Sequence, residues 1–193
     1  MARVALDAER VVRAAAELAD AEGPQRLTLA ALAQRLGIRT PSLYAHVDGL
    51  ADLRLRVAAD ALQELRRVLT AAVLGRAGAD ALRAAAGAYR AWALAHPGRY
   101  ATIAYGACDP ETTAAALGAL DPVLAIMRGY GLEGEDAIHA TRVVRSALHG
   151  FIALQAQGGF QMQADADETW ERMITLLDRG LAAAAPAAAR RGR

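Results

Sequence analysis

The sequence predicts an all-α protein of about nine helices. Apolar residues recur at helical spacing along most of the 193 residues, and no stretch shows the strict alternation of a half-buried strand. Alanine, which has the highest helix propensity, supplies much of the 54% hydrophobic content. Glycine and proline gather in short clusters that divide the chain into helical segments. We expect a three-helix domain over residues 1–50, a larger helical domain over residues 51–185, and a disordered tail over residues 186–193.

Capping residues mark the first three helices. We expect the first helix to run from Asp7 to about Glu22. Thr28 then stands where its hydroxyl can accept a hydrogen bond from the free amides of a second, short helix, and Gly37 can turn the chain sharply after it. Thr40-Pro41 predicts the start of a third helix, because threonine caps helices and proline is tolerated at the first helical position.

The later helices are longer. Capping and breaking residues place them at about residues 48–74, 80–96, 99–106, 110–130, 135–157 and 165–181. Asp121-Pro122 repeats the cap-then-proline pattern inside one of them, so the helix that begins at Pro110 should be kinked or split there.

Composition argues against several classes of protein. The lone Cys108 rules out an internal disulfide framework and suits a reducing cytoplasm. We expect no membrane span, because no apolar stretch reaches about 18 residues without a charge. Asp7 and Glu9 interrupt any secretory signal. The histidines lack metal-ligand spacing, and no phosphate loop or nucleophile elbow occurs, so we expect no metal, cofactor or catalytic site.

Residues 27–47 predict a helix-turn-helix, in which the second helix enters the major groove of DNA. Leu43 and Val47 should face inward. The polar residues that should face outward are Arg39, Thr40, Ser42, Tyr44 and His46. No acidic residue lies between Gly23 and Val47, whereas the whole chain has a formal net charge of only +1, so any nucleic-acid contact should be local.

The outward side chains suit base and phosphate contacts. Arginine pairs bidentately with guanine, and serine, threonine and tyrosine hydroxyls reach phosphates or bases. Thr28 would bring a hydroxyl and free backbone amides to a phosphate. The alternative is an ordinary small bundle, which also needs short capped helices and a glycine turn; the acid-free stretch favours DNA.

The stretch LTLAALAQRLGIRTPSLYAHV, followed by a long helix, resembles the N-terminal DNA-binding domain of the tetracycline-repressor (TetR) family. The similarity covers roughly residues 8–57. It rests chiefly on Ala33, Leu36, Gly37, the Ser42-Leu43-Tyr44 run and His46. It implies a homodimeric, ligand-responsive transcription regulator. It also implies phosphate contacts for Thr28 and Tyr44, and base contacts for Arg39, Thr40 and Ser42.

One position departs from the family pattern. Where the family usually has a phosphate-binding lysine at the start of its fourth helix, this chain has Leu50. Arg54 and Arg3 are the candidates to replace that contact. The chain contains no lysine at all, and each of its 22 basic residues is arginine.

Two later runs, at residues 89–100 and 145–160, resemble the ligand-binding domain of one TetR subgroup. A cavity between the helices at 80–96 and 135–157 could be lined by Tyr89, Trp92, Tyr100, Tyr105, Met127, His149 and Phe151. The alternative is plain hydrophobic core, and for His149 a buried histidine bonded to a carbonyl or a tyrosine. Gly150 costs a helix about 1 kcal/mol relative to alanine, which predicts close approach by a neighbouring helix or a ligand; the alternative is a neutral substitution that the helix tolerates.

The last two helices have more apolar surface than one bundle needs. We therefore expect them to pair with the same helices of a second copy about a two-fold axis. The expected interface residues are Phe151, Trp170, Ile174 and Leu177. Such symmetry would place two recognition helices about 34–36 Å apart on a palindromic operator. The alternative is packing within one chain.

The sequence thus predicts a dimeric repressor that a small, largely apolar molecule releases from double-stranded DNA. The alternative is a helical small-molecule-binding or catalytic protein whose N-terminal bundle serves only for interaction.

Overall fold

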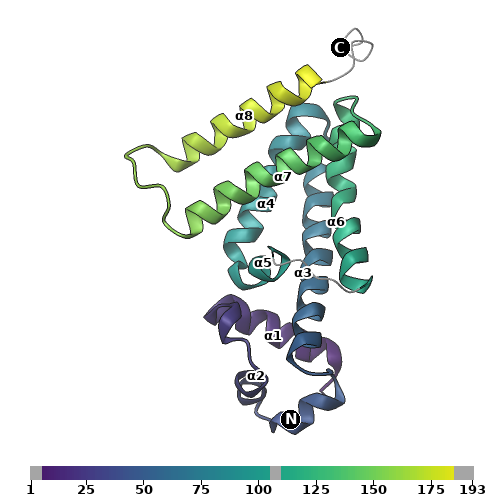
Figure 1. Cartoon of the computed structure of the whole chain (residues 1–193), viewed down its shortest axis with the longest axis vertical. Coiled ribbons are helices and arrows are strands. Elements are labelled where there is room, and N and C mark those ends of the chain that lie inside the picture. The colour runs from purple at the N-terminus through teal and green to yellow at the C-terminus, as the bar shows by residue number, and fades with distance from the viewer. Residues whose placement is uncertain (1–5, 105–109, 185–193) are drawn as a thin grey trace. The chain divides into compact units, whose positions relative to one another are not determined.

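The computed structural model describes residues 6–104 and 110–184, which contain helices and loops and no strand (Figure 1). The helices of the first half are α1 (Ala8–Glu22), η1 (Pro24–Arg26), α2 (Leu29–Leu36), η2 (Thr40–Ala45) and α3 (Leu50–Val73), where η denotes a 3-10 helix. Those of the second half are α4 (Gly78–Ala95), α5 (Pro97–Ala104), α6 (Pro110–Gly129), α7 (Gly134–Ala156) and α8 (Ala166–Ala184). The all-α prediction is confirmed. No helix in these ranges is long and apolar enough to cross a membrane.

Of the kink or split predicted at Pro122, the split does not occur, because α6 continues through this residue. Proline removes one helical hydrogen bond but leaves the side-chain packing of the helix intact. Buried Ala119, Ile126 and Met127 anchor α6 on both sides of the proline, and Asp121 forms an ion pair with Arg66 of α3 at 2.8 Å. This packing keeps the helix continuous.

The chain forms two compact units. Unit 1 comprises Met1–Glu64 and Ala95–Gly118, and unit 2 comprises Leu65–Leu94 and Ala119–Arg193. The chain crosses between them inside α3, at the end of α4 and inside α6. The boundary expected at residue 50 falls at the start of α3, and the predicted tail at 186–193 lies outside the described residues.

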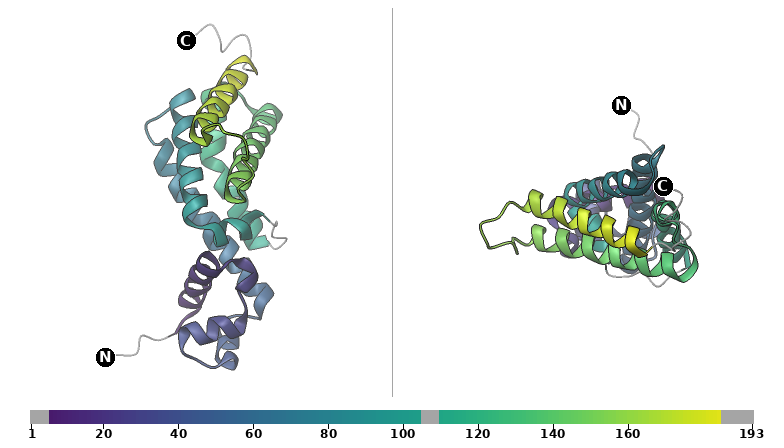
Figure 2. Two further views of the ribbon diagram at one scale, coloured as in Figure 1. Left: turned by 90° about the vertical axis from the view of Figure 1, so that its left-hand side faces the viewer. Right: turned by 90° about the horizontal axis from the view of Figure 1, so that it is seen from above.

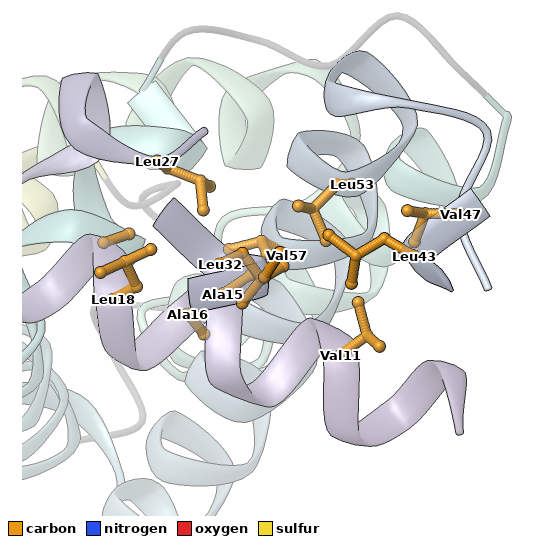
Figure 3. Packing of buried hydrophobic residues seen from close by; sticks show 12 residues of the cluster. Val11, Ala15, Ala16, Leu18, Leu27, Leu32, Leu43, Val47, Leu53 and Val57 are labelled. Carbon is orange, nitrogen blue, oxygen red and sulfur yellow. The ribbon is translucent and has the colours of Figure 1, made fainter. Parts of the chain in front are cut away.

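Unit 1 is built on a core that α1, α2, η2 and the first half of α3 share. The side chain of Asp7 caps α1 by accepting a hydrogen bond from the Arg10 amide at 2.8 Å. The buried side chains of these elements point toward one another in Figure 3. They include Val11, Ala15, Ala16, Leu18, Leu32, Leu43, Leu53 and Val57, and Leu27 and Val47 of the connecting loops belong to the same core. This packing fixes η2 against α1 and α3.

Unit 2 contains the long helices α7 and α8, which run side by side and are joined by a loop (Figures 1 and 2). Two arginines of α4 pair with acids of α8: Arg83 with Glu171 at 2.5 Å, and Arg90 with Asp167 at 2.6 Å. Charged contacts therefore join α8 to α4 in addition to its apolar packing.

Candidate nucleic-acid interface and effector domain

The turn between α2 and η2 has the predicted construction. Thr28 caps α2, its hydroxyl oxygen accepting a hydrogen bond from the Ala31 amide at 3.1 Å. Gly37 ends the helix in the left-handed conformation with φ 66°, and its amide donates to the Ala33 and Gln34 carbonyls. Because side chains rarely adopt this conformation, glycine makes the sharp turn possible. We call α2, this turn and η2 (residues 29–45) the reading head.

The second helix of the reading head is a 3-10 helix. Its bonds span three residues, from the Ser42 amide to the Arg39 carbonyl and from the His46 amide to the Leu43 carbonyl, both at 2.9 Å. Residues three apart are stacked in such a helix. Thr40, Leu43 and His46 therefore share one row, and Leu43 at its centre is fully buried. Thr40 and His46 are consequently only half-exposed, less available to DNA than the prediction assumed.

The other two rows of η2 face solvent. Ser42 is exposed, and so is Tyr44 at 58%. Pro41 and Ala45 are also exposed, and sequence reasoning missed them because it applied the 3.6-residue spacing of an α-helix to a 3-10 helix. Apolar side chains at such positions can contact the thymine methyl group.

Arg39 differs from the neighbouring arginines in its surroundings. Arg35 pairs with Glu17 of α1 at 3.3 Å, and Arg26 pairs with Glu22 at 4.0 Å. Arg39 is exposed at the start of η2 and forms no ion pair within the described parts of the chain. Its five N–H donors are therefore open to an acceptor outside the protein.

The start of α3 has apolar and already paired side chains where the family pattern has a lysine. Leu50 is half-buried against the unit 1 core. The Asp52 carboxylate accepts a hydrogen bond from the Asp48 amide at 2.9 Å and pairs with Arg56 at 2.9 Å. Arg54 is exposed and donates to the Leu27 carbonyl over 3.5 Å, a long bond that a phosphate could replace. Arg3, the other candidate, lies outside the described residues.

The predicted ligand residues are divided between the units. Trp92, Met127 and Phe151 are buried in unit 2, where Tyr89 and His149 are half-buried. Tyr100 belongs to unit 1, and Tyr105 lies outside the described residues.

Phe151 lies in an aromatic cluster. Its ring centroid is 5.1 Å from that of Trp170 and 4.8 Å from that of Phe160. The Arg90 guanidinium carbon lies 5.5 Å and 5.0 Å from the Phe151 and Trp170 rings, within cation–π range. These contacts favour a packing role for Phe151.

Sequence reasoning missed one buried polar group in unit 2. Thr141 of α7 is 5% exposed, and its hydroxyl has no hydrogen-bond partner in the part of the chain that the structure describes. In the sequence, a threonine at helical spacing among apolar residues looks like a core residue of the size of valine, so the pattern does not indicate that its hydroxyl has a role.

The predicted dimer residues face the interior of their own chain. Phe151, Trp170 and Ile174 are buried, and Leu177 is half-buried. No atom of the described residues beyond the local helix lies within 4 Å of a Cβ built on Gly150, so the close approach expected there is not made by a helix of the same chain.

Comparison with known proteins identifies the family of the chain. A family model described as "Tetracyclin repressor-like, C-terminal domain" matches residues 82–177. An uncharacterised HTH-type transcriptional regulator of Mycobacterium tuberculosis, Rv0681, is 42% identical over 179 residues, which cover 91% of this chain and 82% of that protein. A second, YobS of Bacillus subtilis, is 36% identical over 181 residues, covering 93% of this chain and 94% of that protein. The chain belongs to the TetR family.

Solved structures of similar proteins share the TetR-family fold. ActR from Streptomyces coelicolor, solved in its apo form, has a TM-score of 0.72 at 22% identity, covering 95% of this chain and 98% of that one. ActR has also been solved in complex with (S)-DNPA, with a TM-score of 0.71 at 20% identity and coverage of 95% and 100%. The resemblance inferred from residues 27–47 therefore extends to the fold of nearly the whole chain.

Proposed function

We propose that this TetR-family chain is a dimeric repressor that binds a palindromic operator through η2 and is released by a small molecule. The observation that carries the proposal is the exposed guanidinium of Arg39, which has no ion pair among the described residues and lies beside exposed Ser42 and Tyr44. Leu43 and Val47 hold this surface rigidly against α1 and α3. A guanidinium without an acid partner can pair with guanine without breaking an ion pair first.

Phosphate contacts would surround this base contact. The Thr28 oxygen accepts a hydrogen bond from the Ala31 amide, so its hydroxyl hydrogen remains available as a donor to a phosphate oxygen. Tyr44 offers a second hydroxyl from η2. Such contacts position the protein on the duplex, whereas base contacts carry the sequence preference.

For the dimer, the exposed faces of α7 and α8 offer a surface for a second copy. On α7, Val143 (59% exposed), Ala147, Gly150 and Leu154 (51%) lie at i, i+4, i+7 and i+11 and form one stripe. On α8, Met173, Leu176 (68%) and Gly180 form another. The glycines leave room for a partner backbone to come close, which accounts for Gly150. The buried Phe151, Trp170 and Ile174 then support the interface from beneath.

For the effector, two features suggest a mostly apolar molecule with a hydrogen-bonding group. The buried surroundings in unit 2 include Trp92 and Met127, and the Thr141 hydroxyl has no hydrogen-bond partner among the described residues. The complex of ActR, a protein of the same fold, with (S)-DNPA supports a small-molecule effector. Binding would shift the equilibrium only as far as the effector prefers the DNA-free state. We place the protein in the cytoplasm and assign it no catalytic activity.

Operator binding by Arg39→Ala tests the proposal. Duplexes selected by the wild-type chain from a random library would be used in a gel-shift titration at several salt concentrations. Loss of a bidentate pair should weaken binding by about 1–3 kcal/mol, or roughly 5- to 150-fold, and relax the preference at one base pair. Arg26→Ala removes another exposed arginine, outside η2, and should keep the base preference. Unchanged base preference in the Arg39 variant would refute its assignment.

A further inference from the structure

One arginine in unit 1 binds acceptors from three separate segments. The Arg99 side chain, 16% exposed, donates from Nε to Asp20 Oδ2 of α1 at 2.6 Å. Its Nη1 donates to Glu64 of α3, and its Nη2 lies 2.7 Å from His96 Nδ1, just before α5. We call these four residues the Arg99 network. A planar guanidinium with fixed donor directions holds three such acceptors in one geometry, which a lysine cannot do.

The backbone at the start of α5 also packs closely against α1. The Arg99 amide donates to Asp20 Oδ1 at 2.8 Å, so a side chain of α1 satisfies a free amide in the first turn of α5. A Cβ built on Gly98 would lie 2.1 Å from both the carbonyl carbon and the oxygen of Ala19. The first turn of α5 therefore rests directly on the last turn of α1, with no space for movement toward it.

The Arg99 network lies where the chain crosses between the units. Glu64 is the last residue of unit 1 before α3 passes into unit 2, and His96 is the second residue after the chain returns from α4. The third acceptor, Asp20, belongs to α1, whose buried Val11 and Leu18 share a core with Leu43 of η2. Arg99 thus binds residues next to two of the three points where the chain crosses between the units, and also binds α1, the helix that packs against the reading head.

We propose that Arg99 is a positioning residue that transmits displacements of α3 and α4 in unit 2 to α1, and so to the reading head. The inference rests on the proposed function, in which unit 2 binds the effector and the reading head binds DNA. Helix shifts of about 1–2 Å are typical of allosteric transitions, and they exceed the range over which a hydrogen bond holds. When α3 or the end of α4 shifts by this amount, either α1 moves with it or the hydrogen bonds of the Arg99 network break.

Thermal unfolding without DNA tests the coupling directly. Both tryptophans, Trp92 and Trp170, lie in unit 2, so tryptophan fluorescence follows that unit, whereas far-ultraviolet circular dichroism follows all helices. The two curves should coincide for the wild-type chain and separate by about 4 °C or more in Arg99→Gln. Separated wild-type curves, or coincident curves in the variant, would overturn the proposal.

A matched control removes another arginine that pairs with α1. Arg35→Gln breaks the exposed pair with Glu17 but touches neither crossing, so its curves should stay coincident. Arg99→Lys and Glu64→Gln keep the experiment decisive if Arg99→Gln does not fold. The lysine variant retains the charge without the fork, and the glutamine variant removes one acceptor charge, so each should separate the curves by a smaller amount. Coincident curves in both would count against the network.

Amide hydrogen exchange, measured with and without bound DNA, tests whether Arg99 transmits displacements between unit 2 and the reading head. With a duplex selected by the wild-type chain, DNA should slow exchange in the reading head and also in the last turns of α4. In Arg99→Gln, DNA should still slow exchange in the reading head. The factor by which DNA slows exchange in α4 should be at least about tenfold smaller than in the wild-type chain. Retained α4 protection in the variant would contradict the role of Arg99. If the wild-type chain selects no DNA, the proposed function fails, and the unfolding curves still decide the coupling.

Discussion

At the scale of single residues, side chains of the same type differ in their ion-pair partners in ways that the sequence does not indicate. Arg26, Arg35 and Arg39 are equivalent in composition, yet the first two have acid partners and the third has none within the described residues. The partner of Arg35 is 18 positions away, and only the packing of α2 on α1 brings it close. Long-range pairing of this kind has no local sequence signal.

Gly98 provides a test of the contact between α1 and α5. In Gly98→Ala the new methyl group would overlap the Ala19 backbone, which cannot rotate away as a side chain could. We expect the free energy of unfolding to fall by about 2–3 kcal/mol, measured by urea denaturation.

Gly87→Ala is the matched control for that substitution. Gly87 lies exposed inside α4, and nothing stands within 4 Å of its Cβ position among the described residues. Alanine there should raise stability by up to about 1 kcal/mol, through helix propensity alone. Equal effects of the two alanines would show that α5 can move away from α1.

Much of the reading head was predictable because its signals are local. Thr28, Gly37 and Thr40-Pro41 mark their own caps and turns, and buried Leu43 and Val47 agree with the inward positions expected of them. The 3-10 geometry of η2 was not predicted, because the four-residue step between Leu43 and Val47 suits an α-helix, whereas Val47 in fact lies beyond the end of η2. That geometry moved Thr40 and His46 toward the core and brought Pro41 and Ala45 to the surface.

At the scale of elements, amphipathicity alone did not say which apolar face meets which partner. The last two helices have two apolar stripes each, one buried within the chain and one exposed. The sequence prediction chose Phe151, Trp170 and Ile174, which the structure places on the inner stripe. The same limitation applied at Pro122, where tertiary packing kept α6 continuous despite a local breaking signal.

The outer stripe of α7 gives a prediction about assembly. Leu154→Glu would place a charge in the proposed interface, where burial without a partner is costly. We expect the dimer dissociation constant to rise at least about 100-fold, measured by sedimentation equilibrium. Leu74→Glu, which charges a more exposed leucine beyond the end of α3, should leave it unchanged. A Leu154 variant that stays dimeric would place the interface elsewhere.

At the scale of the whole molecule, two-fold symmetry should appear in the DNA. Two reading heads of one dimer would bind half-sites whose centres lie about one helical turn apart. Inserting about 5 base pairs between the half-sites turns one half-site to the opposite side of the duplex. Inserting about 10 base pairs, one full helical turn, brings both half-sites back to the same side. We expect the short insertion to reduce affinity to the level of a single half-site in a gel-shift titration, and the long one to recover part of it. Equal binding to both would indicate independent monomers.

The shortness of η2 limits how much sequence information one dimer can read. Six residues at about 2 Å each span roughly 12 Å, or three to four base pairs at about 3.4 Å per pair. Two such helices together specify about seven base pairs, a pattern that recurs by chance roughly once in 16,000, against some 10⁶ or more competing genomic sites. About 60 or more chance matches would then compete with the true operator. Most of the discrimination must therefore come from half-site spacing and DNA shape.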